Sequence, residues 1–400
     1  MLEITERPLS IALNPLAIID RIIGGLELTP DQYELAKKGY QHVAEILRRQ
    51  NSVVIAFSPD IFPQGSIRLG TTVRPIGAER FDLDMVCKLM IAGKNQTPHT
   101  IHNLVWEALG QDETCKKIRE RKSRCIRLTL PESTKFYLDV TPAIPDWNYQ
   151  SPLLLVPDRE LKIWCSSHPI GYADEWFKPI AETPPQFSMV AFANASESLL
   201  ANRGRVERLP EYGEFEKKPL QRIVQLLKYN RNRYFQGDDV NRPSSILITT
   251  ITAQSYLDTV DETFGGLIDF VISVVEKLPN YIKIENTSEG QTYIVLNPVN
   301  ELENFAEKWT TVNYQKFIQW HSQLCKWIHS LRDANGVGTD VLLNRLKVSF
   351  DSDLVIKAAN SIGVDTQKFH EEGRLRADNI TGKVSLIVGA PIPQTIYHGK

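Results

Sequence analysis

The sequence predicts an α+β protein with two lobes, a core of mixed helices and strands followed by a mainly helical lobe. The chain has 400 residues, more than one hydrophobic core usually holds. Strand-like segments gather in the first half, at 81–89, 124–130 and 135–144. Beyond the charged, turn-rich stretch 201–218, apolar residues recur mainly at helical spacing. We therefore expect the two lobes to meet near this stretch.

The expected boundaries follow from these changes of pattern. We expect the first lobe over residues 1–205, the helical lobe over 206–387 and a mobile tail over 388–400. The tail, VGAPIPQTIYHGK, holds two prolines and no helical period, so ordering it would bury little apolar surface. Helices of the second lobe are expected at 219–235, 244–258, 263–277, 301–331, 338–348 and 351–362.

Two helices are predicted in the first lobe. Thr29 can cap a helix whose first turn holds Pro30 and Asp31, both suited to a helix N-terminus. A second helical pattern covers residues 98–110, and Pro131 begins a predicted turn between two of the strands. Strands and helices are therefore interleaved in this lobe.

Composition excludes several classes of protein. A net charge of −2 and a pI near 6.5 argue against a nucleic-acid binder that uses its whole surface. No apolar run is long enough to span a bilayer, so no membrane partner is expected. The five cysteines form no CxxC pair, which argues against a zinc ribbon or a disulfide framework. A cytoplasmic location is the expectation.

Asp82 and Asp84 form the most informative pair of residues. In Phe81-Asp82-Leu83-Asp84, carboxylates two apart on a strand point to the same face. Like charges on an otherwise apolar strand repel each other and lose hydration unless a cation compensates them. Mg²⁺, which prefers oxygen ligands, is the expected cation. Considered alone, the pair also fits a solvated strand face.

Two neighbouring features strengthen the metal-site interpretation. In Gln64-Gly65-Ser66, glycine allows close approach of a phosphate and serine adds a donor, although a plain tight turn is the alternative. Asp139 is a lone carboxylate in the apolar strand 135–144. It is either a third metal ligand, if its strand pairs with 81–89, or a buried acid satisfied by backbone amides or an arginine.

At these residues the chain resembles the bacterial cGAS/DncV-like nucleotidyltransferases, also called CD-NTases or the SMODS family. The resemblance extends over residues 60–310. It rests on an ordered set of motifs: Gln64-Gly65-Ser66, Thr71-Thr72-Val73-Arg74-Pro75, Phe81-Asp82-Leu83-Asp84, Leu138-Asp139-Val140, Leu220 to Lys228, Pro243-Ser244-Ser245 and Asn297-Pro298.

The resemblance implies a polymerase-β-like core, a mainly helical second lobe and an active site in the cleft between them. It implies two Mg²⁺ ions, with Mn²⁺ as a substitute, on Asp82, Asp84 and Asp139, which are also the catalytic residues. It assigns NTP binding to Gln64, Gly65, Ser66, Lys228, Ser244 and Ser245. Alternatives remain for two of them: Lys228 as an exposed helix cation, and Ser244 as a helix cap only.

The implied function is condensation of NTPs into a cyclic di- or oligonucleotide with release of pyrophosphate. In the family the product activates a separate effector in antiviral signalling, and in some relatives a partner protein acts on the C-terminal tail. No His/Cys cluster is present, so DNA activation is not expected. Two alternatives stay open: nucleotidyl transfer to a protein, RNA end or small molecule, and a catalytically silent regulatory protein.

Overall fold

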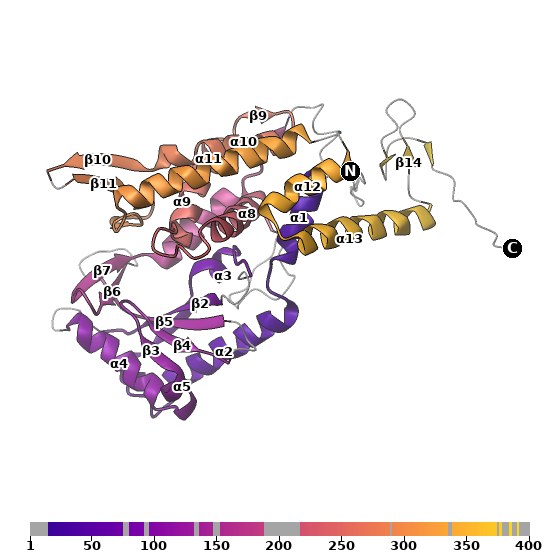
Figure 1. Ribbon diagram of the computed structural model, residues 1–400. Helices are drawn as coiled ribbons and strands as arrows, with labels where there is room; N and C mark the ends of the chain where they lie inside the picture. The colour runs from indigo at the N-terminus through magenta and orange to yellow at the C-terminus, as the bar shows by residue number, and fades with distance from the viewer. Residues whose placement is uncertain are drawn as a thin grey trace, which may run out of the picture.

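The computed structural model describes most of the chain and shows two lobes (Figure 1). One lobe is built on a β-sheet and the other on helices α8 to α12. The described residues are 15–74, 80–91, 96–131, 136–146, 153–187, 217–288, 290–334, 338–373, 376–377, 384–385 and 390–391.

A seven-stranded mixed sheet forms the centre of the first lobe. Its order is β1-β2-β5-β4-β3, with β6 paired to β5 and β7 to β6; β2 and β5 are parallel and the other pairs antiparallel. The three strands predicted from the sequence are β2, β4 and β5, and all are confirmed. The strands are β1 (Asp60–Pro63), β2 (Phe81–Lys88), β3 (Arg119–Arg121), β4 (Ile126–Thr129), β5 (Phe136–Pro145), β6 (Leu154–Asp158) and β7 (Ile163–Ser167).

Helices α2 (Pro30–Arg48), α4 (Pro98–Gly110) and α5 (Glu113–Ile118) pack on the sheet. The hydroxyl of Thr29 accepts from the backbone N–H of Gln32 in a capping box, so α2 begins where the sequence predicts. Leu83, Met85 and Cys87 are fully buried in the same core as these helices. Since side chains alternate along β2, its aspartates point to the opposite face.

The second lobe surrounds a helix that is buried on all sides. Thr249, Thr250 and Thr252 of this helix are buried, and each hydroxyl donates to the carbonyl four residues earlier at 2.6–2.8 Å. These bonds satisfy polar groups that no water reaches. The helices are α8 (Pro219–Tyr234), the buried α9 (Ser245–Leu257), α10 (Leu267–Glu276), η5 (Leu278–Tyr281), α11 (Thr311–Asp333), α12 (Thr339–Ser349) and α13 (Ser352–Glu371).

Two early segments pack into the core of the helical lobe. Ile18 and Ile22 of α1 (Pro15–Gly25) are buried with Leu220 and Val224 of α8. The π-helical segment η4 (Gly171–Phe177) and α6 (Lys178–Glu182) contribute to the same core. This core also contains Leu69, the last residue of α3 (Gly65–Leu69). The chain therefore crosses between the lobes more than once, and both lobes share the segments around α3.

The second lobe contains short strands that the sequence pattern did not predict. The expected helix at 301–331 is wrong over its first ten residues, because α11 starts only at Thr311 behind a Thr310 capping box. The side chain of Asn304 accepts from the N–H groups of Val295 and Ala306 and so fixes a non-helical bend. The strands are β8 (Gln186–Phe187), β9 (Thr263–Phe264), β10 (Lys283–Thr287), β11 (Gly290–Ile294), β12 (Leu296–Asn297) and β13 (Asn300–Asn304).

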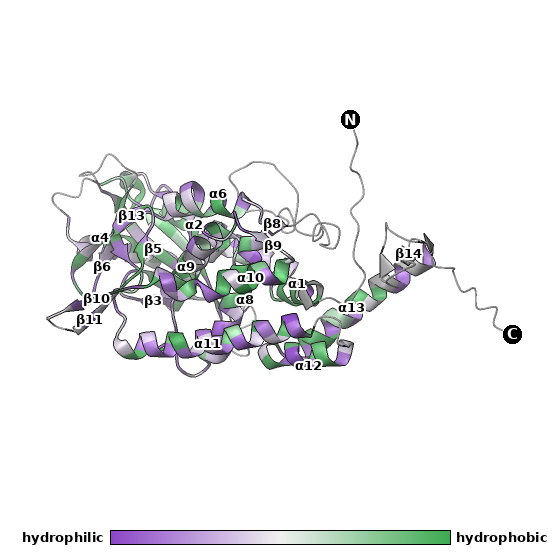
Figure 2. Ribbon diagram, turned by 90° about the horizontal axis from the view of Figure 1, so that it is seen from above, coloured by the Kyte–Doolittle hydropathy of each residue, from purple (hydrophilic) through white to green (hydrophobic). Residues whose placement is uncertain are grey.

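Helix α13 extends away from the body of the protein (Figures 1 and 2). Beyond it, β14 (Arg376–Ala377) pairs with β15 (Val384–Ser385) and β16 (Ala390–Pro391). Apart from β16, the predicted mobile tail 388–400 lies outside the described residues. Among the described helices, none combines the length and apolar character needed to cross a membrane.

Candidate active site

Three adjacent strands place charged side chains in one row across the sheet. Asp84 of β2 lies opposite Asp139 of β5, and Asp139 lies opposite Arg127 of β4. Asp82, two residues before Asp84, shares its face. The structure thus brings together the three aspartates that were predicted from separate parts of the sequence.

The aspartates differ in exposure. The side chain of Asp82 is 51% exposed, whereas that of Asp139 is 9% exposed. Burial, with the negative charges of Asp82 and Asp139, raises the pKa of Asp84 to about 7. A raised carboxyl pKa means that the folded protein disfavours the charged form here, as expected of carboxylates gathered without enough positive charge.

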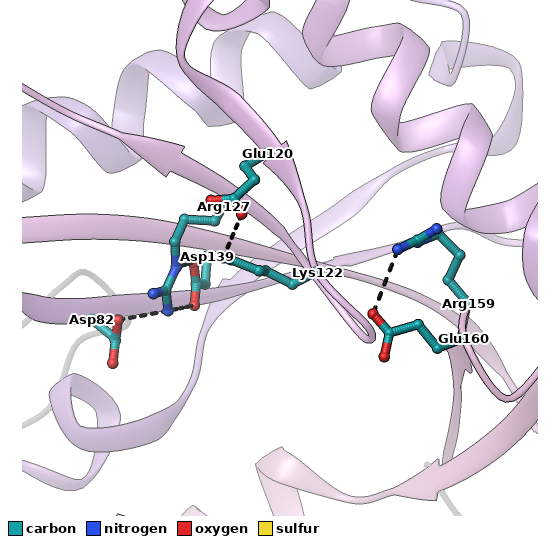
Figure 3. A network of polar contacts seen from close by, with 7 residues as sticks. All are labelled: Asp82, Glu120, Lys122, Arg127, Asp139, Arg159 and Glu160. Carbon is teal, nitrogen blue, oxygen red and sulfur yellow. Dashed lines mark hydrogen bonds and ion pairs between the residues drawn. The ribbon is translucent and has the colours of Figure 1, made fainter. Parts of the chain in front are cut away.

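Arg127 supplies positive charge to this cluster (Figure 3). Its Nε donates to Asp139 Oδ1 at 2.8 Å and its Nη2 donates to Asp139 Oδ2 at 2.6 Å, which makes a bidentate ion pair. The same Nη2 donates to Asp82 Oδ1 at 2.8 Å. These bonds to Asp139 raise the pKa of Arg127, so the guanidinium is charged. In this structure Asp139 is therefore an acid paired with an arginine, one of the two predicted states.

The Gln64-Gly65-Ser66 segment lies directly against the aspartates. The N–H of Gln64 donates to the carbonyl of Asp84 at 3.0 Å, and α3 starts at Gly65. Gly65 has a φ of +63°, and a Cβ on it would lie 2.4 Å from Asp84 Oδ2. Only glycine fits both the backbone conformation and this approach. The segment is thus the turn into α3, and it needs glycine because it lies against Asp84.

Lys228 of α8 is buried between the lobes. Its Nζ donates to the carbonyl of Thr71 at 2.8 Å, and the residue is 6% exposed. Burial and the nearby charge of Arg231 lower its pKa to about 7, although Asp84 and Asp82 favour the charged form. The alternative of an exposed helix cation is therefore wrong. Lys228 faces the loop after α3 and is electrostatically coupled to the carboxylates.

Ser244 and Ser245 stand at the start of α9. Ser244 is the N-cap, since its hydroxyl accepts from the N–H of Leu247 at 3.3 Å. The hydroxyl of Ser245 accepts from Arg231 Nη2 at 3.2 Å, and Arg231 also donates to the carbonyl of Pro243. Ser244 thus caps α9 in this structure. A helix N-terminus beside a buried arginine also favours anions.

Sequence reasoning gave no role to two residues that lie at this site, Arg127 and Thr71. Arg127 stands out locally only as a polar position between the buried Ile126 and Leu128 of β4. Its pairing with Asp139 depends on strand register, which one sequence does not reveal. The buried hydroxyl of Thr71 has no hydrogen-bond partner within the described part of the chain. The carbonyl of the same residue accepts from Lys228. The Thr71 hydroxyl is therefore another candidate group for binding a ligand.

Comparisons with known proteins agree with this geometry. The family model for the nucleotidyltransferase domain of cyclic GMP-AMP synthase DncV-like proteins matches residues 59–142, which include all three aspartates. A c-di-GMP synthase of Roseivirga ehrenbergii is 34% identical to this chain over 336 residues, covering 83% of each protein.

Solved structures show the same fold. The CD-NTase CdnG of Bradyrhizobium diazoefficiens, in complex with GTP, aligns with a TM-score of 0.65 and 18% identity, over 88% of this chain and 99% of that one. CdnC of Escherichia coli MS115-1, in complex with HORMA-deltaN, aligns with a TM-score of 0.59 and 14% identity, over 85% and 98% of the two chains.

The fold and the row of aspartates define a polymerase-β-like nucleotidyltransferase. The chain belongs to the bacterial CD-NTases, the DncV-like branch of these enzymes. The fold class and the family predicted from the sequence are thereby confirmed.

Proposed function

We propose that this enzyme condenses two molecules of GTP into cyclic di-GMP, releasing two molecules of pyrophosphate, in a reaction that depends on Mg²⁺. The row formed by Asp82, Asp84 and Asp139 carries the proposal, because it supplies the catalytic face that nucleotidyl transfer requires. The relative that is 34% identical and is named a c-di-GMP synthase supports GTP as the substrate.

The donor atoms fit a hard divalent cation. Asp82, Asp84 and Asp139 offer only carboxylate oxygens, which Mg²⁺ and Mn²⁺ prefer. Arg127 shows that Asp82 and Asp139 can share one positive group between them. We propose that these three residues hold two Mg²⁺ ions, which would stabilise the negative charge on the reacting phosphate oxygens.

The residues of the site account for the chemistry as follows. A ribose hydroxyl of one GTP loses its proton near Asp139 and attacks the α-phosphorus of the other GTP. The new P–O bond forms as the bond to pyrophosphate breaks. In a second transfer, a ribose hydroxyl of the nucleotide that lost pyrophosphate attacks the α-phosphorus of the other nucleotide, which closes the ring and releases the second pyrophosphate.

The triphosphate is proposed to lie between the α3 loop and the helical lobe. Gly65 lets the loop lie against Asp84, while Gln64 and Ser66 offer donors from the same loop. Lys228 of α8 supplies a positive charge from the side of the helical lobe. Ser244 and Ser245 add the N-terminus of α9, which lies beside Arg231.

Two kinds of partner protein are proposed: an effector that responds to the cyclic product, and a protein that binds this enzyme. By family, the cyclic product is proposed to activate a separate effector in antiviral defence. CdnC was solved with HORMA-deltaN, which supports a protein partner for this chain as well. The C-terminal tail is one proposed place for such a partner, whereas DNA is not proposed as an activator.

Product analysis tests the proposal. The purified enzyme is incubated with α-³²P-labelled GTP and Mg²⁺, treated with phosphatase and separated by chromatography. We expect a phosphatase-resistant product with the mass of cyclic di-GMP, and none when EDTA replaces Mg²⁺. Label that remains on protein or RNA would instead support nucleotidyl transfer to another acceptor, and unchanged GTP would support a regulatory protein without activity.

A further inference from the structure

Arg127 occupies the position where the proposed metal site needs positive charge. We propose that Arg127 is a built-in counter-ion of the metal-free enzyme, which competes with divalent cations and releases Asp82 when a cation binds. This inference rests on the proposed function, because it assumes that Asp82 and Asp139 are metal ligands.

The contacts of Arg127 are those of a built interaction rather than a loose surface pair. Both oxygens of Asp139 accept from the guanidinium, and a single nitrogen, Nη2, reaches both aspartates. The guanidinium carbon also lies 4.4 Å from the centre of the Tyr137 ring, so the planar group is supported from one side. The arginine side chain is 24% exposed, which limits screening by water.

A divalent cation and Nη2 compete for the same oxygens. Asp139 Oδ2 and Asp82 Oδ1 both accept from Nη2, so a cation held by these two carboxylates would compete with the guanidinium for their negative charge. Two positive groups at this spacing also repel each other. The arginine therefore has to give up at least one carboxylate before a cation binds between them.

Asp82 is the carboxylate that Arg127 is expected to release. Its side chain is half exposed and held by one hydrogen bond, whereas Asp139 is nearly buried and held by two. Breaking the exposed contact costs less, since water replaces the lost hydrogen bond. Nε can keep its bond to Asp139 Oδ1 while the guanidinium stays on Tyr137.

Binding of Mn²⁺ to the nucleotide-free enzyme tests the inference without measuring activity. Free Mn²⁺ is counted by electron paramagnetic resonance for wild type, R127Q and R80Q. Arg80 is the matched control, because it lies 5.3 Å from the same Tyr137 ring but donates to the carbonyl of Leu130. We expect R127Q to bind Mn²⁺ at least about tenfold more tightly, roughly 1.4 kcal/mol, and R80Q to match wild type.

Stability without metal provides the second readout. In EDTA, R127Q leaves the aspartates uncompensated, so its Tm should fall below that of wild type, and Mn²⁺ should raise its Tm more than it raises that of wild type. Unchanged or weaker Mn²⁺ binding by R127Q would overturn the inference, because a purely structural arginine predicts that result.

A measurement on wild type covers the case in which R127Q does not fold. The ¹⁵Nε–H signal of Arg127 should shift on titration with Mg²⁺, while that of Arg80 stays in place; an Arg127 signal unchanged at saturating Mg²⁺ contradicts the inference. Failure of wild type to bind Mn²⁺ even with a GTP analogue would refute the metal site itself. Normal Mn²⁺ binding with no effect of R127Q would refute only the role of Arg127.

Discussion

Gly65 lies closer to the Asp84 carboxylate than any residue with a side chain could. Its φ of +63° is strained for L-residues, and an added Cβ would meet Asp84 Oδ2 at 2.4 Å. We expect G65A to lower turnover at least about 100-fold, because a shift of the loop misplaces both the phosphate and Asp84. The folded state should lose only about 1–3 kcal/mol, which denaturant unfolding measures. Activity close to wild type in a folded G65A would show that the loop does not approach the phosphate.

The pKa of Lys228 predicts how GTP binding depends on pH. This pKa is lowered to about 7, and only the charged amine attracts a triphosphate. Because the charged fraction decreases as pH rises above 7, the affinity for GTP should decrease from pH 7 to 9. Bound phosphate raises the lysine pKa, so binding should also take up a proton in this range. Calorimetry in buffers with different ionisation enthalpies measures both effects.

K228M is the control for this pH dependence. It should bind GTP more weakly at pH 7, with affinity and proton uptake nearly independent of pH above 7. The weaker binding of K228M should appear mainly as a raised KM, since the positive charge of Lys228 would stabilise the ground state and the transition state alike. A K228M variant with the same pH profile as wild type would assign the effect to another group.

At the scale of elements, one face of α8 holds the loop that follows α3. Gln221, Gln225 and Lys228 are spaced along this face, and they donate to the carbonyls of Leu69, Thr72 and Thr71 at 2.8–2.9 Å. The helical lobe thus fixes the backbone that leads away from Gly65 and Ser66. We therefore expect nucleotide binding to depend on both lobes.

Gln225 offers a test of this coupling away from the carboxylates. It is buried, and its amide donates to Thr72 and to Glu27. We expect Q225A to lower the free energy of unfolding by about 1–3 kcal/mol and to raise the KM for GTP severalfold with a smaller change in kcat. The control is Q236A, at an exposed residue in the turn after α8, which should change neither quantity. If Q225A lowers stability but leaves the KM for GTP unchanged, the contact between Gln225 and Thr72 does not contribute to nucleotide binding.

Elements with strong local signals were predictable from the sequence. The caps of α2 and α9 and the apolar alternation of β2 depend on neighbouring residues, so their bounds were correct to within a few positions. The strands between 283 and 304 were missed because they form short hairpins that are largely polar and exposed. Their bends depend on side-chain bonds such as those of Asn304, which no period indicates.

The site was predictable only as a set of residue types. The spacing of Asp82 and Asp84 places them on one face, whatever the fold. The row from Asp84 through Asp139 to Arg127 depends on pairing between strands far apart in sequence. An arginine was among the possible partners for Asp139, but which arginine could not be known without this register.

At the scale of the whole molecule, the elements that carry the candidate site lie apart from the last described strands. The strands β2 and β5 and the helices α3 and α8 belong to the body, whereas β14 to β16 lie beyond the far end of α13 (Figure 1). We expect deletion of residues 392–400 to leave synthesis by the purified enzyme and its Tm unchanged, while regulation by a tail-binding partner is lost. Loss of synthesis, or unfolding, on deletion would contradict this separation.

The central claim is that Asp82, Asp84 and Asp139 hold the catalytic cations. A crystal structure with Mn²⁺ and a non-hydrolysable GTP analogue tests it most directly, because anomalous scattering locates Mn²⁺ without reference to activity. We predict anomalous peaks among these three carboxylates and the triphosphate, and no peak there in D82N/D84N. Peaks elsewhere, with the three carboxylates free of metal and with Asp82 and Asp139 still paired with Arg127, would contradict the account.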